Sequence, residues 1–401
     1  MKVKTIAEFN PSPSAQIQSR NTIDYIDTAS VVEGKLCEVQ HLVNIFPSRA
    51  QREIHSCDIL ISSVRPNLKH NYFVEDGANG MIASSGFIHI RVKNPLVISP
   101  RFLYYYLTSP AQVQHYVKIA DSSQSAYPSF NKDVIENIDL PEIDLPTQLR
   151  IAGVLGSIDE KIELNRKKIA ELEALAKTIY DYWFVQFDFP DKNGKPYKSS
   201  GGKMVWNEQL KREVPEGWGV GKLSDIATIT MGQSPEGSSL NESENGTLFF
   251  QGSSDFGEVV PSNRVYTISP TRMANSGDVL LSVRAPVGAT NIALLPCCIG
   301  RGLASLRGKD CSNVFILQTL SLVKSRFAAK NVDGTTFGSL SKDELGGLEI
   351  LKPPVALAHV FDNLAIPIME QVLGLVHSIR EAEYLRDTLL PLLMNGQIEV
   401  E

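Results

Sequence analysis

The chain has 401 residues, of which 43% are hydrophobic and 21% charged, and its formal net charge is −6. This composition is that of a folded protein with room for two or more hydrophobic cores, and it excludes an intrinsically disordered chain. No stretch approaches the roughly 18 uninterrupted apolar residues that a membrane span needs. Residues 1–9 also lack the apolar run of a signal peptide, so we expect a cytoplasmic protein.

The negative charge is concentrated near the C-terminus. Residues 353–401 contain two basic and seven acidic residues, whereas 191–352 contain 18 basic and 16 acidic ones. A nucleic-acid-binding protein needs positive charge only on the face that meets phosphate, so an acidic total does not decide the question. The distribution is compatible with local phosphate-binding surfaces in the globular parts of the chain.

Residues 1–145 have the pattern of a globular unit that mixes strands and helices. Short runs of β-branched residues, bounded by Gly, Pro, Asn and Ser, predict strands at 58–64 and 87–92. A short amphipathic helix is expected at 100–107. Because helices do not alternate regularly with the strands, the pattern indicates an α+β domain rather than a doubly wound parallel sheet.

A long helix is predicted for 147–184, within a segment that we delimit as 146–190. Its apolar side chains are spaced alternately by four and three residues, as in a coiled-coil seam. The seam positions are Ile151, Leu155, Ile158, Ile162, Asn165, Ile169, Leu172, Ala176, Ile179 and Trp183. Asn165 either lies buried, where it fixes the register, or is rotated to the edge of the interface. Pro146 either lies in the first helical turn or precedes it, with Thr147 as the N-cap.

A second globular unit is predicted for 191–352. Residues 187–202, which lead into it, have the Gly, Ser and turn residues typical of a linker. A short helix is expected at 314–327. Strands are predicted at 247–250, 278–283 and 303–306. The mixture of elements again indicates an α+β domain.

The last segment, 353–401, predicts a second long helix with the same spacing of apolar residues. Its seam positions are Leu357, Phe361, Leu364, Ile368, Gln371, Leu375, Ser378, Ala382, Leu385, Leu389 and Leu392. Val372 and Ile379 widen the stripe beside the two polar positions. Pro367 should kink the helix or leave a carbonyl without a hydrogen bond, and Asn395-Gly396 is a stop signal. Two such helices on one chain most simply pack together as an antiparallel coiled coil.

The order of a globular unit followed by a long helix occurs twice, and similar stretches recur at separations of roughly 210 to 220 residues. The matched stretches are Asp58-Ile-Leu-Ile-Ser-Ser-Val-Arg65 with Asp278-Val-Leu-Leu-Ser-Val-Arg284, Tyr25-Ile-Asp-Thr-Ala-Ser30 with Phe249-Phe-Gln-Gly-Ser-Ser254, and Pro128-Ser-Phe-Asn-Lys-Asp133 with Gly338-Ser-Leu-Ser-Lys-Asp343. Such a pseudo-twofold repeat lets a monomer imitate a dimer, so we expect it to bind something that also has two halves. Because the copies differ in sequence, the two halves of the ligand should differ too.

Sequence motifs for catalysis are missing. There is no G-x-x-x-x-G-K-[ST] loop, no Gly-x-Ser-x-Gly elbow and no H-E-x-x-H pair. The nearest approach to the Asn/Asp-Pro-Pro-aromatic motif of DNA amino-methyltransferases is Asn10-Pro-Ser-Pro13, which lacks the adjacent prolines and the aromatic residue. Asp58 and Asp278 begin matched strands, and we favour turn residues over paired catalytic carboxylates. The cysteines form no C-x-x-C pair and are interpreted as reduced thiols; they are Cys37, Cys57, Cys297, Cys298 and Cys311.

Together these features resemble the specificity subunit of Type I restriction–modification systems. The resemblance covers the whole chain and rests on stretches that are specific in combination. They are Gly277-Asp-Val-Leu-Leu-Ser-Val-Arg-Ala-Pro-Val-Gly-Ala289, Cys298-Ile-Gly-Arg-Gly-Leu303, Gly334-Thr-Thr-Phe-Gly-Ser-Leu-Ser-Lys-Asp-Glu-Leu345, Tyr182-Trp-Phe-Val-Gln-Phe-Asp-Phe189 and Leu389-Leu-Pro-Leu-Leu-Met-Asn-Gly396. The chain departs from the family pattern at Val355-Ala-Leu-Ala-His359, where a Glu-Gln-containing entry to the second helix is usual, and at Pro367.

The resemblance implies two target-recognition domains, 1–145 and 191–352, alternating with two long helices, 146–190 and 353–401. Each recognition domain would read one half of a bipartite, asymmetric DNA site, and the helices would set the spacing between the halves. Two modification subunits, which carry the S-adenosylmethionine chemistry, would dock on the helices. Two restriction subunits that use ATP and Mg²⁺ would join for cleavage. The chain itself would bind no cofactor or metal and catalyse no reaction.

Candidate DNA-contacting residues are polar or basic side chains on loops at matching places in the two halves, because such side chains read base edges and grip phosphates. In the first half they are Asp27, Thr28, Ser30, Arg49, Arg65, Ser123 and Ser125. In the second half they are Gln251, Ser253, Ser254, Arg284, Arg301, Thr335 and Thr336. Arg65 and Arg284 are the strongest candidates. Two other classes of function stay open from the residues alone: a DNA methyltransferase or nuclease with disguised motifs, and a coiled-coil scaffold that does not bind DNA.

Overall fold

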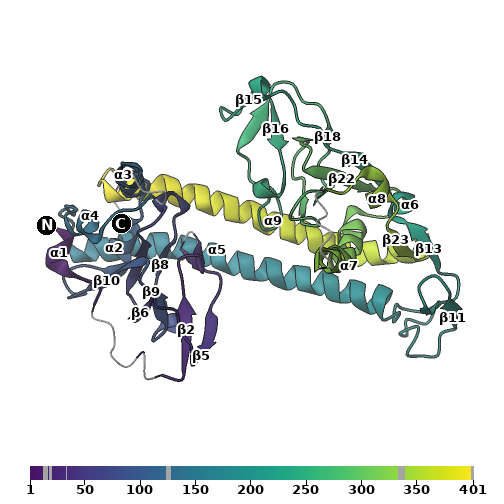
Figure 1. Cartoon of the computed structure of the whole chain (residues 1–401), viewed down its shortest axis with the longest axis horizontal. Coiled ribbons are helices and arrows are strands. Elements are labelled where there is room, and N and C mark those ends of the chain that lie inside the picture. Colours follow the sequence, from purple (N-terminus) through teal and green to yellow (C-terminus); the bar gives the residue numbers. More distant parts are fainter. Residues whose placement is uncertain (12–16, 18–19, 33, 123–127, 333–338, 399–401) are drawn as a thin grey trace. The chain divides into compact units, whose positions relative to one another are not determined.

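The computed structural model describes residues 1–11, 17, 20–32, 34–122, 128–332 and 339–398, with the backbone alone for 325–332 (Figure 1). Two compact units make up the chain: Met1–Glu163 together with Arg380–Glu401, and Leu164–Ile379. Each unit therefore contains one globular domain and a part of each long helix. Among the described residues, no helix is long and apolar enough to span a membrane.

The globular domain of the first unit is built on two four-stranded sheets. The first is antiparallel and has the spatial order β1 (Ala7–Phe9), β10 (Phe87–Val92), β7 (Ile59–Ser62) and β8 (Asn71–Phe73). The second has a central parallel pair and the order β5 (Gln40–Val43), β2 (Thr22–Ile26), β9 (Ile82–Ser84) and β6 (Ala50–Glu53). A small ribbon joins β3 (Val31–Val32) to β4 (Lys35–Leu36). The strands predicted at 58–64 and 87–92 are confirmed as β7 and β10.

The helices of this domain are α1 (Val3–Ile6), α2 (Pro100–Leu107), α3 (Pro110–Asp121) and α4 (Lys132–Glu136). Helix α2, which was predicted, begins where Ser99 accepts a hydrogen bond from the Phe102 amide at 3.3 Å. Helix α3 was not predicted. The main core packs the first sheet and α2 against parts of both long helices; among its buried members are Ile59, Ile61, Ile88, Ile90, Phe102, Leu103, Ile151, Leu155, Leu390 and Leu393.

The globular domain of the second unit repeats this plan. Its first sheet has the order β14 (Ala227–Met231), β22 (Leu303–Gly308), β19 (Val279–Ser282) and β20 (Thr290–Ile292). Its second sheet has the order β15 (Leu240–Asn241), β17 (Val265–Thr267), β16 (Thr247–Phe250), β21 (Cys297–Ile299) and β18 (Met273–Ala274). The accompanying helices are α6 (Leu223–Ile226), α7 (Asn313–Val332) and α8 (Lys342–Gly346). Strand β15 has no counterpart among the described strands of the first domain.

Strand pairing defines which residues of the two domains are equivalent. In the parallel pairs, Tyr25 lies opposite Ile82 as Phe249 lies opposite Cys298, so the predicted match of Tyr25 with Phe249 is confirmed. The match of Arg65 with Arg284 was wrong. The structure pairs the residues without a gap: the isolated bridge that joins Arg284 to Ser339 joins Val64 to Ser129 in the first domain. Sequence comparison had shifted the register by one residue to align the two arginines.

The segment that looked like a linker is packed against the second domain. Phe187 and Phe189 are buried against Trp218, with ring centroids 5.3 and 5.4 Å away, and Tyr197 stacks on Phe189. Asp188 accepts hydrogen bonds from the amide and hydroxyl of Ser199. The remaining strands of this unit form a hairpin, β11 (Met204–Asn207) with β12 (Arg212–Pro215), and a pair, β13 (Gly219–Lys222) with β23 (Glu349–Lys352).

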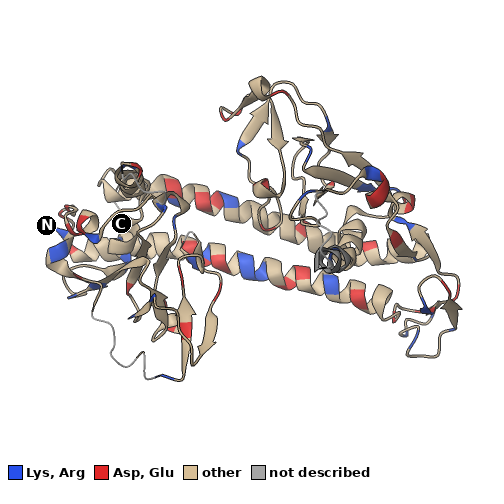
Figure 2. Ribbon diagram, viewed as in Figure 1, with Lys and Arg blue, Asp and Glu red and all other residues tan. Residues whose placement is uncertain are grey.

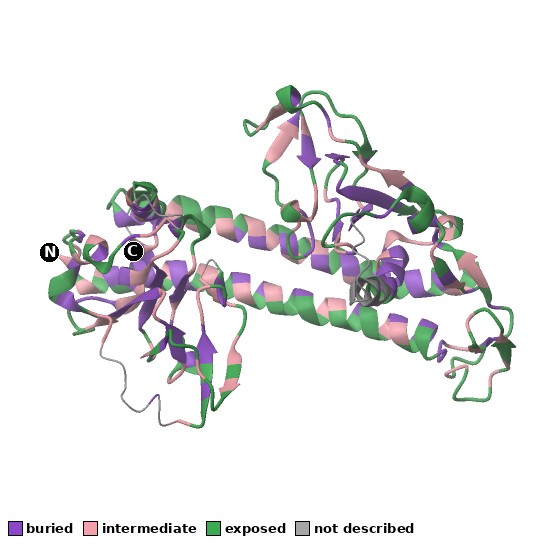
Figure 3. Cartoon of the chain, in the orientation of Figure 1, coloured by how far each residue is buried: buried purple, intermediate pink, exposed green. Residues whose placement is uncertain are grey.

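The first long helix, α5, spans Leu145–Tyr180 and ends in a π-helical turn, Asp181–Val185. Pro146 therefore lies in the first turn, where a missing amide hydrogen is tolerated. Every predicted seam position is buried or half-buried, and buried and exposed residues alternate along the helix (Figure 3). Lys and Arg alternate with Asp and Glu on its exposed side (Figure 2). Asn165 is 6% exposed and donates to Ser378 Oγ at 3.2 Å, so the buried alternative is confirmed.

The second long helix, α9, spans Val355–Met394 and continues through Pro367. Its predicted seam was only partly right: Phe361 and Ala382 are buried, but Leu364 and Leu385 are 46% and 48% exposed. The other buried apolar residues are Ala358, Ala365, Met369, Val372, Val376, Ile379, Leu390, Leu393 and Met394, of which Val372 and Ile379 were expected beside the seam. Two of these buried positions, Ala358 and Ala365, are alanines. A pattern that prefers leucine to alanine therefore selects exposed neighbours such as Leu364. After Met394, Gly396 has φ 65° and the amide of Gln397 donates to the Leu392 carbonyl, which confirms the stop signal.

Candidate nucleic-acid interface

A buried aspartate supports the same edge of the first sheet in each domain. Asp58 precedes β7 and accepts two hydrogen bonds from Arg91 of β10, at 2.8 and 2.6 Å, and one from His89 Nε2 at 2.7 Å. It also accepts the amide hydrogen of His55 at 2.8 Å. Burial raises the pKa of Asp58, but the hydrogen bonds from Arg91 and His89 outweigh it and lower that pKa to about 2.

Asp278 repeats this arrangement before β19. Arg307 of β22 donates to it at 2.7 and 3.0 Å, Ser305 Oγ donates at 2.9 Å, and the Asn275 amide closes the turn at 2.8 Å. The predicted turn role of the two aspartates is confirmed, and the arginines were missed because they lie some thirty residues further along the chain. Since both carboxylates are saturated by structural donors, they hold neighbouring strands together and offer no free catalytic oxygen.

A serine after each aspartate shapes the exit of the strand. Ser282 Oγ donates to the Arg284 carbonyl at 2.7 Å, and Ser62 Oγ donates to the Val64 carbonyl at 2.9 Å. Both serines are buried, whereas Arg284 is exposed. After this turn the second domain places Arg284 at the surface, whereas the first domain has the half-buried Val64 at the equivalent position.

In the second domain, backbone hydrogen bonds bring three of the predicted loops side by side. The amide of Gly302 donates to the Gln251 carbonyl at 3.2 Å, and the amide of Val283 donates to the Gly302 carbonyl at 2.9 Å. The exposed side chains of Gln251, Arg301 and Arg284 consequently lie on one edge of the domain. Guanidinium and amide groups grouped in this way are those that contact phosphates and base edges.

Ser253 and Ser254 lie in a single 3₁₀ turn beside this edge. Ser254 is exposed and Ser253 half-buried. The turn is closed by Asp255, whose carboxylate accepts the amide hydrogen of Gln251 at 2.6 Å. The predicted residues Thr335 and Thr336 lie outside the described residues, as do Ser123 and Ser125 in the first domain.

In the first domain the structure separates the predicted residues into two groups. Arg49 and Arg65 are exposed, and Thr28 is half-buried. Asp27 and Ser30 instead form a turn, because Asp27 Oδ1 accepts the Ser30 amide at 2.9 Å and its hydroxyl at 3.0 Å. Ser30 is 1% exposed. Its role is therefore structural, and it does not reach a ligand at the surface.

A polar groove of about 310 Å³ in the first domain was not predicted. It is lined by Asn10, Ser63, Ser85, Phe87, Ile88, Phe130, Asn131, Lys132 and Asp133. Ser63 and Ser85 lie on the edge equivalent to that of Val283 and Arg301, since the Ser63 amide donates to the Gly86 carbonyl at 3.2 Å. Asn10 has a φ of 48°, a left-handed conformation that asparagine tolerates better than most residues, and no local sequence pattern marked it as part of this groove.

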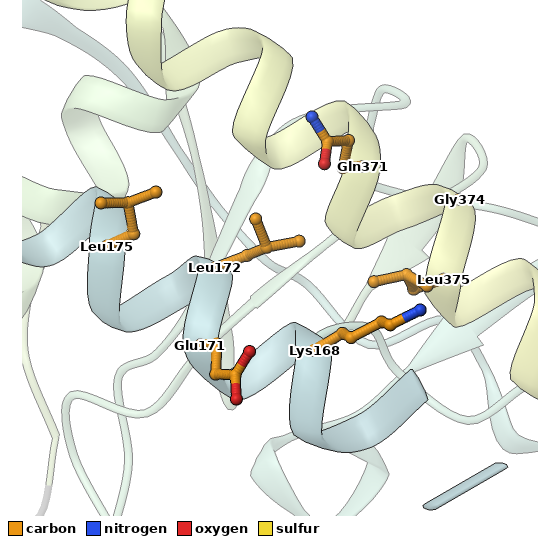
Figure 4. Close-up of a pocket in the computed structure, with 7 residues that line it drawn as sticks. All are labelled: Lys168, Glu171, Leu172, Leu175, Gln371, Gly374 and Leu375. Atoms are coloured by element: carbon orange, nitrogen blue, oxygen red, sulfur yellow. The ribbon is translucent and has the colours of Figure 1, made fainter. Parts of the chain in front are cut away.

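A second groove, of about 590 Å³, lies between α5 and α9 in the second unit (Figure 4). It is lined by Lys168, Glu171, Leu172, Leu175, Gln371, Gly374 and Leu375. Leu175 is 48% exposed, and Gly374 contributes no side chain. The groove is thus an apolar surface with a charged rim. Among the described residues, no group of three or more His, Cys, Asp or Glu side chains is placed to hold a metal ion.

Comparison with known proteins decides the family. The model of the type I restriction modification DNA specificity domain matches residues 1–174 and 215–358. The chain belongs to this family. It is a specificity subunit, whose role is the recognition of DNA, and it is a non-catalytic component.

Relatives of this specificity subunit include the putative type I restriction enzyme MjaX specificity subunit of Methanocaldococcus jannaschii. It is 30% identical over 309 residues, which are 76% of this chain and 69% of that protein. The type I restriction enzyme HindI specificity subunit of Haemophilus influenzae is 23% identical over an alignment of 456 positions, covering 98% of this chain and 96% of that protein. The S subunit from M. genitalium shares the fold, with a TM-score of 0.57 at 14% identity over 98% of this chain and 95% of that one.

Proposed function

We propose that the two recognition domains, 1–145 and 191–352, each read one half of a bipartite, asymmetric DNA site. The observation that carries this proposal is the equivalence of the two domains, which share strand orders and buried Asp–Arg pairs yet carry different side chains at equivalent positions of one edge. Val64 corresponds to Arg284, and Asp27 to Gln251. Two domains with the same fold but different side chains on the proposed DNA-reading edge fit a DNA site whose halves differ in sequence.

The DNA-contacting residues that we propose are the exposed members of the predicted set. In the first domain these are Arg49 and Arg65, to which we add the half-buried Thr28. In the second domain they are Gln251, Ser254, Arg284 and Arg301, with the half-buried Ser253 beside them. The grooved edge at Asn10, Ser63 and Ser85 adds neutral polar groups in the first domain. Arginine and lysine give salt-dependent affinity, whereas amides and hydroxyls discriminate between bases.

We also propose that α5 and α9 pair as an antiparallel coiled coil that sets the spacing between the half-sites. Within the second unit, Asn165 contacts Ser378 and Tyr180 contacts Phe361. The residue number therefore rises along α5 as it falls along α9, as antiparallel pairing requires. A hydrogen-bonded Asn–Ser pair within an apolar seam favours one register over others.

The partners in this proposal are two modification subunits, docked on the exposed faces of the long helices, and two restriction subunits. S-adenosylmethionine would bind to the modification subunits, and ATP and Mg²⁺ to the restriction subunits. The groove bordered by Leu172, Leu175 and Leu375 offers an apolar surface of the kind that protein partners cover.

Methylome sequencing tests the proposed function. A host that expresses this chain with its modification subunit should show methylated adenines in one bipartite motif with unequal halves. Deleting the chain should remove the motif. A methylome that does not change on deletion would contradict the proposal, and a symmetric or undivided motif would contradict the assignment of one half-site to each domain.

A further inference from the structure

We propose that Gln251 is a base-reading residue of the second recognition domain and that it selects adenine at one position of the half-site bound there. This inference rests on the proposed function, because it requires the domain to read DNA. It goes further in assigning one side chain to one kind of base. The support comes from the way the amide of Gln251 is held.

The orientation of the Gln251 amide is fixed by Ser234. Ser234 Oγ donates to Gln251 Oε1 at 3.0 Å, and the same hydroxyl accepts the amide hydrogen of Arg301 at 3.3 Å. The hydroxyl thus donates its single hydrogen to Gln251 and uses one of its two lone pairs for the Arg301 amide. The Nε2 group of Gln251 has no partner among the residues that the structure describes, and the residue is exposed.

Close packing of the glycine loop at 300–302 fixes the backbone of Gln251, from which this side chain projects. A Cβ atom on Gly300 would lie 2.8 Å from Gln251 Oε1 and 3.0 Å from its Cα, and one on Gly302 would lie 2.6 Å from the Gln251 carbonyl. The glycines therefore allow the loop at 300–302 to contact Gln251 directly. On the other side of the loop, the carboxylate of Asp255 accepts a hydrogen bond from the backbone amide of Gln251 at 2.6 Å. A side chain held in this way loses little conformational freedom on binding.

The free groups of the held amide match adenine. In the major groove, adenine presents an acceptor at N7 next to a donor at N6, and a glutamine amide can bind both at once. Gln251 Nε2 supplies the donor. Its Oε1 has two lone pairs, of which Ser234 occupies one, so the other can accept the adenine N6 hydrogen. Guanine presents two acceptors on this edge and would leave one of them facing Oε1.

The first domain does not repeat this device. The residue equivalent to Gln251 is Asp27, and its Oδ1 is saturated by the amides of Ala29 and Ser30 and the Ser30 hydroxyl. Its Oδ2 accepts from Gln40 at 3.4 Å. Substitution of Gln251 should consequently alter one half of the recognised sequence and leave the other half unchanged.

The test is a binding selection with the complex of this chain and its modification subunits. Duplexes in which each position of the wild-type motif is randomised in turn are selected for binding, and bound sequences are counted. For Gln251→Ala, preference for adenine at one position of one half-site should fall by about tenfold. For Gln251→Glu, which keeps the shape but only accepts hydrogen bonds, the preference at that position should change to cytosine.

Gln209→Ala is the matched control, because Gln209 is an exposed glutamine on the turn of the β11–β12 hairpin; its motif should equal that of the wild type. Unchanged discrimination at every position in both Gln251 variants would overturn the inference. Loss of all selectivity in both variants would also overturn it, since a residue that reads one base leaves the rest of the site recognised. If the wild-type complex itself selects no bipartite sequence, the proposed function fails.

Discussion

Arg386 on α9 and Asp159 on α5 form an ion pair, with 3.0 Å between Nη1 and Oδ1. Tyr105 of α2 donates to the other oxygen of the same carboxylate at 2.6 Å. One carboxylate therefore joins the first recognition domain to both long helices. If the domain reads DNA at a fixed spacing, as we propose, this contact would couple stability to function.

Arg386→Ala should lower the free energy of unfolding by about 1–3 kcal/mol, because it leaves the Asp159 carboxylate, which is 29% exposed, without its charged donor. Urea denaturation of the whole chain measures the change. Arg150→Ala is the control, since Arg150 is an exposed arginine of α5 whose hydrogen bond goes to Thr147. An effect of Arg386→Ala no larger than that of Arg150→Ala would show that the ion pair contributes nothing.

The phase of the α9 seam can be tested with two leucines of the same helix. Leu390 is 6% exposed in the core of the first unit, and Leu385 is 48% exposed. Leu390→Ala should destabilise the chain by about 2–5 kcal/mol, because it removes buried methyl groups and leaves a cavity. Leu385→Ala should change stability by less than about 1 kcal/mol in the absence of partners. Equal losses of stability in the two variants, measured by thermal unfolding, would instead support the seam predicted from the sequence.

Asp58 should give the first domain a pH-dependent stability. Its pKa in the folded protein is about 2, below the ordinary value of 3.8, so the folded state favours the ionised form. The contribution, about 2 kcal/mol, is present above pH 4 and is lost as the pH falls from 4 towards 2. The difference in unfolding free energy between wild type and Asp58→Asn should therefore shrink over that range. Asp121→Asn, at an exposed position, is the control substitution and should leave the unfolding free energy nearly unchanged. If the difference in unfolding free energy between wild type and Asp58→Asn did not change with pH, the lowered pKa of Asp58 would be contradicted.

Arg284→Ala should weaken binding of the complex to its cognate duplex and reduce the slope of log Kd against log salt by about one, as expected for the loss of a phosphate contact. If Arg284 instead reads a guanine, the mutation should relax specificity at one position and cost about 1–3 kcal/mol. Fluorescence anisotropy at several salt concentrations measures both effects. Lys211→Ala, which removes an exposed cation from the β11–β12 hairpin, should leave affinity and slope unchanged. Unaltered binding by Arg284→Ala would remove that residue from the interface.

The extent of each element was largely predictable, because strands β10 and β16 and helix α2 follow local patterns of β-branched or amphipathic residues and have sharp boundaries. The phase of α9 was not, since Ala365 and Leu364 are both apolar and only the partner surface decides which one is buried. Helix α3 was missed although its buried residues, Val113, Tyr116 and Ala120, are spaced by three and four residues, as in an amphipathic helix.

The candidate site depended on contacts that no local pattern records. Arg65 and Arg284 looked equivalent because arginine is rarer than the serine or valine beside it, yet bridges to Ser129 and Ser339 place Val64 opposite Arg284. Asp27 looked like a surface acid, although its oxygens close a turn. What the repeat did allow was the matching of loops between the two halves, on which the proposed reading edge is based.

Because only the second domain has strand β15, the two halves of the chain should differ in their tendency to aggregate as separate fragments. In the second domain β17 has a neighbour on each side, whereas among the described residues β5 pairs with β2 alone, and Val43 and Ile45 at its end are 62% and 84% exposed. An open strand edge with apolar side chains is a template for intermolecular pairing. Of two fragments made by cutting the chain in half, the N-terminal one should therefore be the more prone to aggregate.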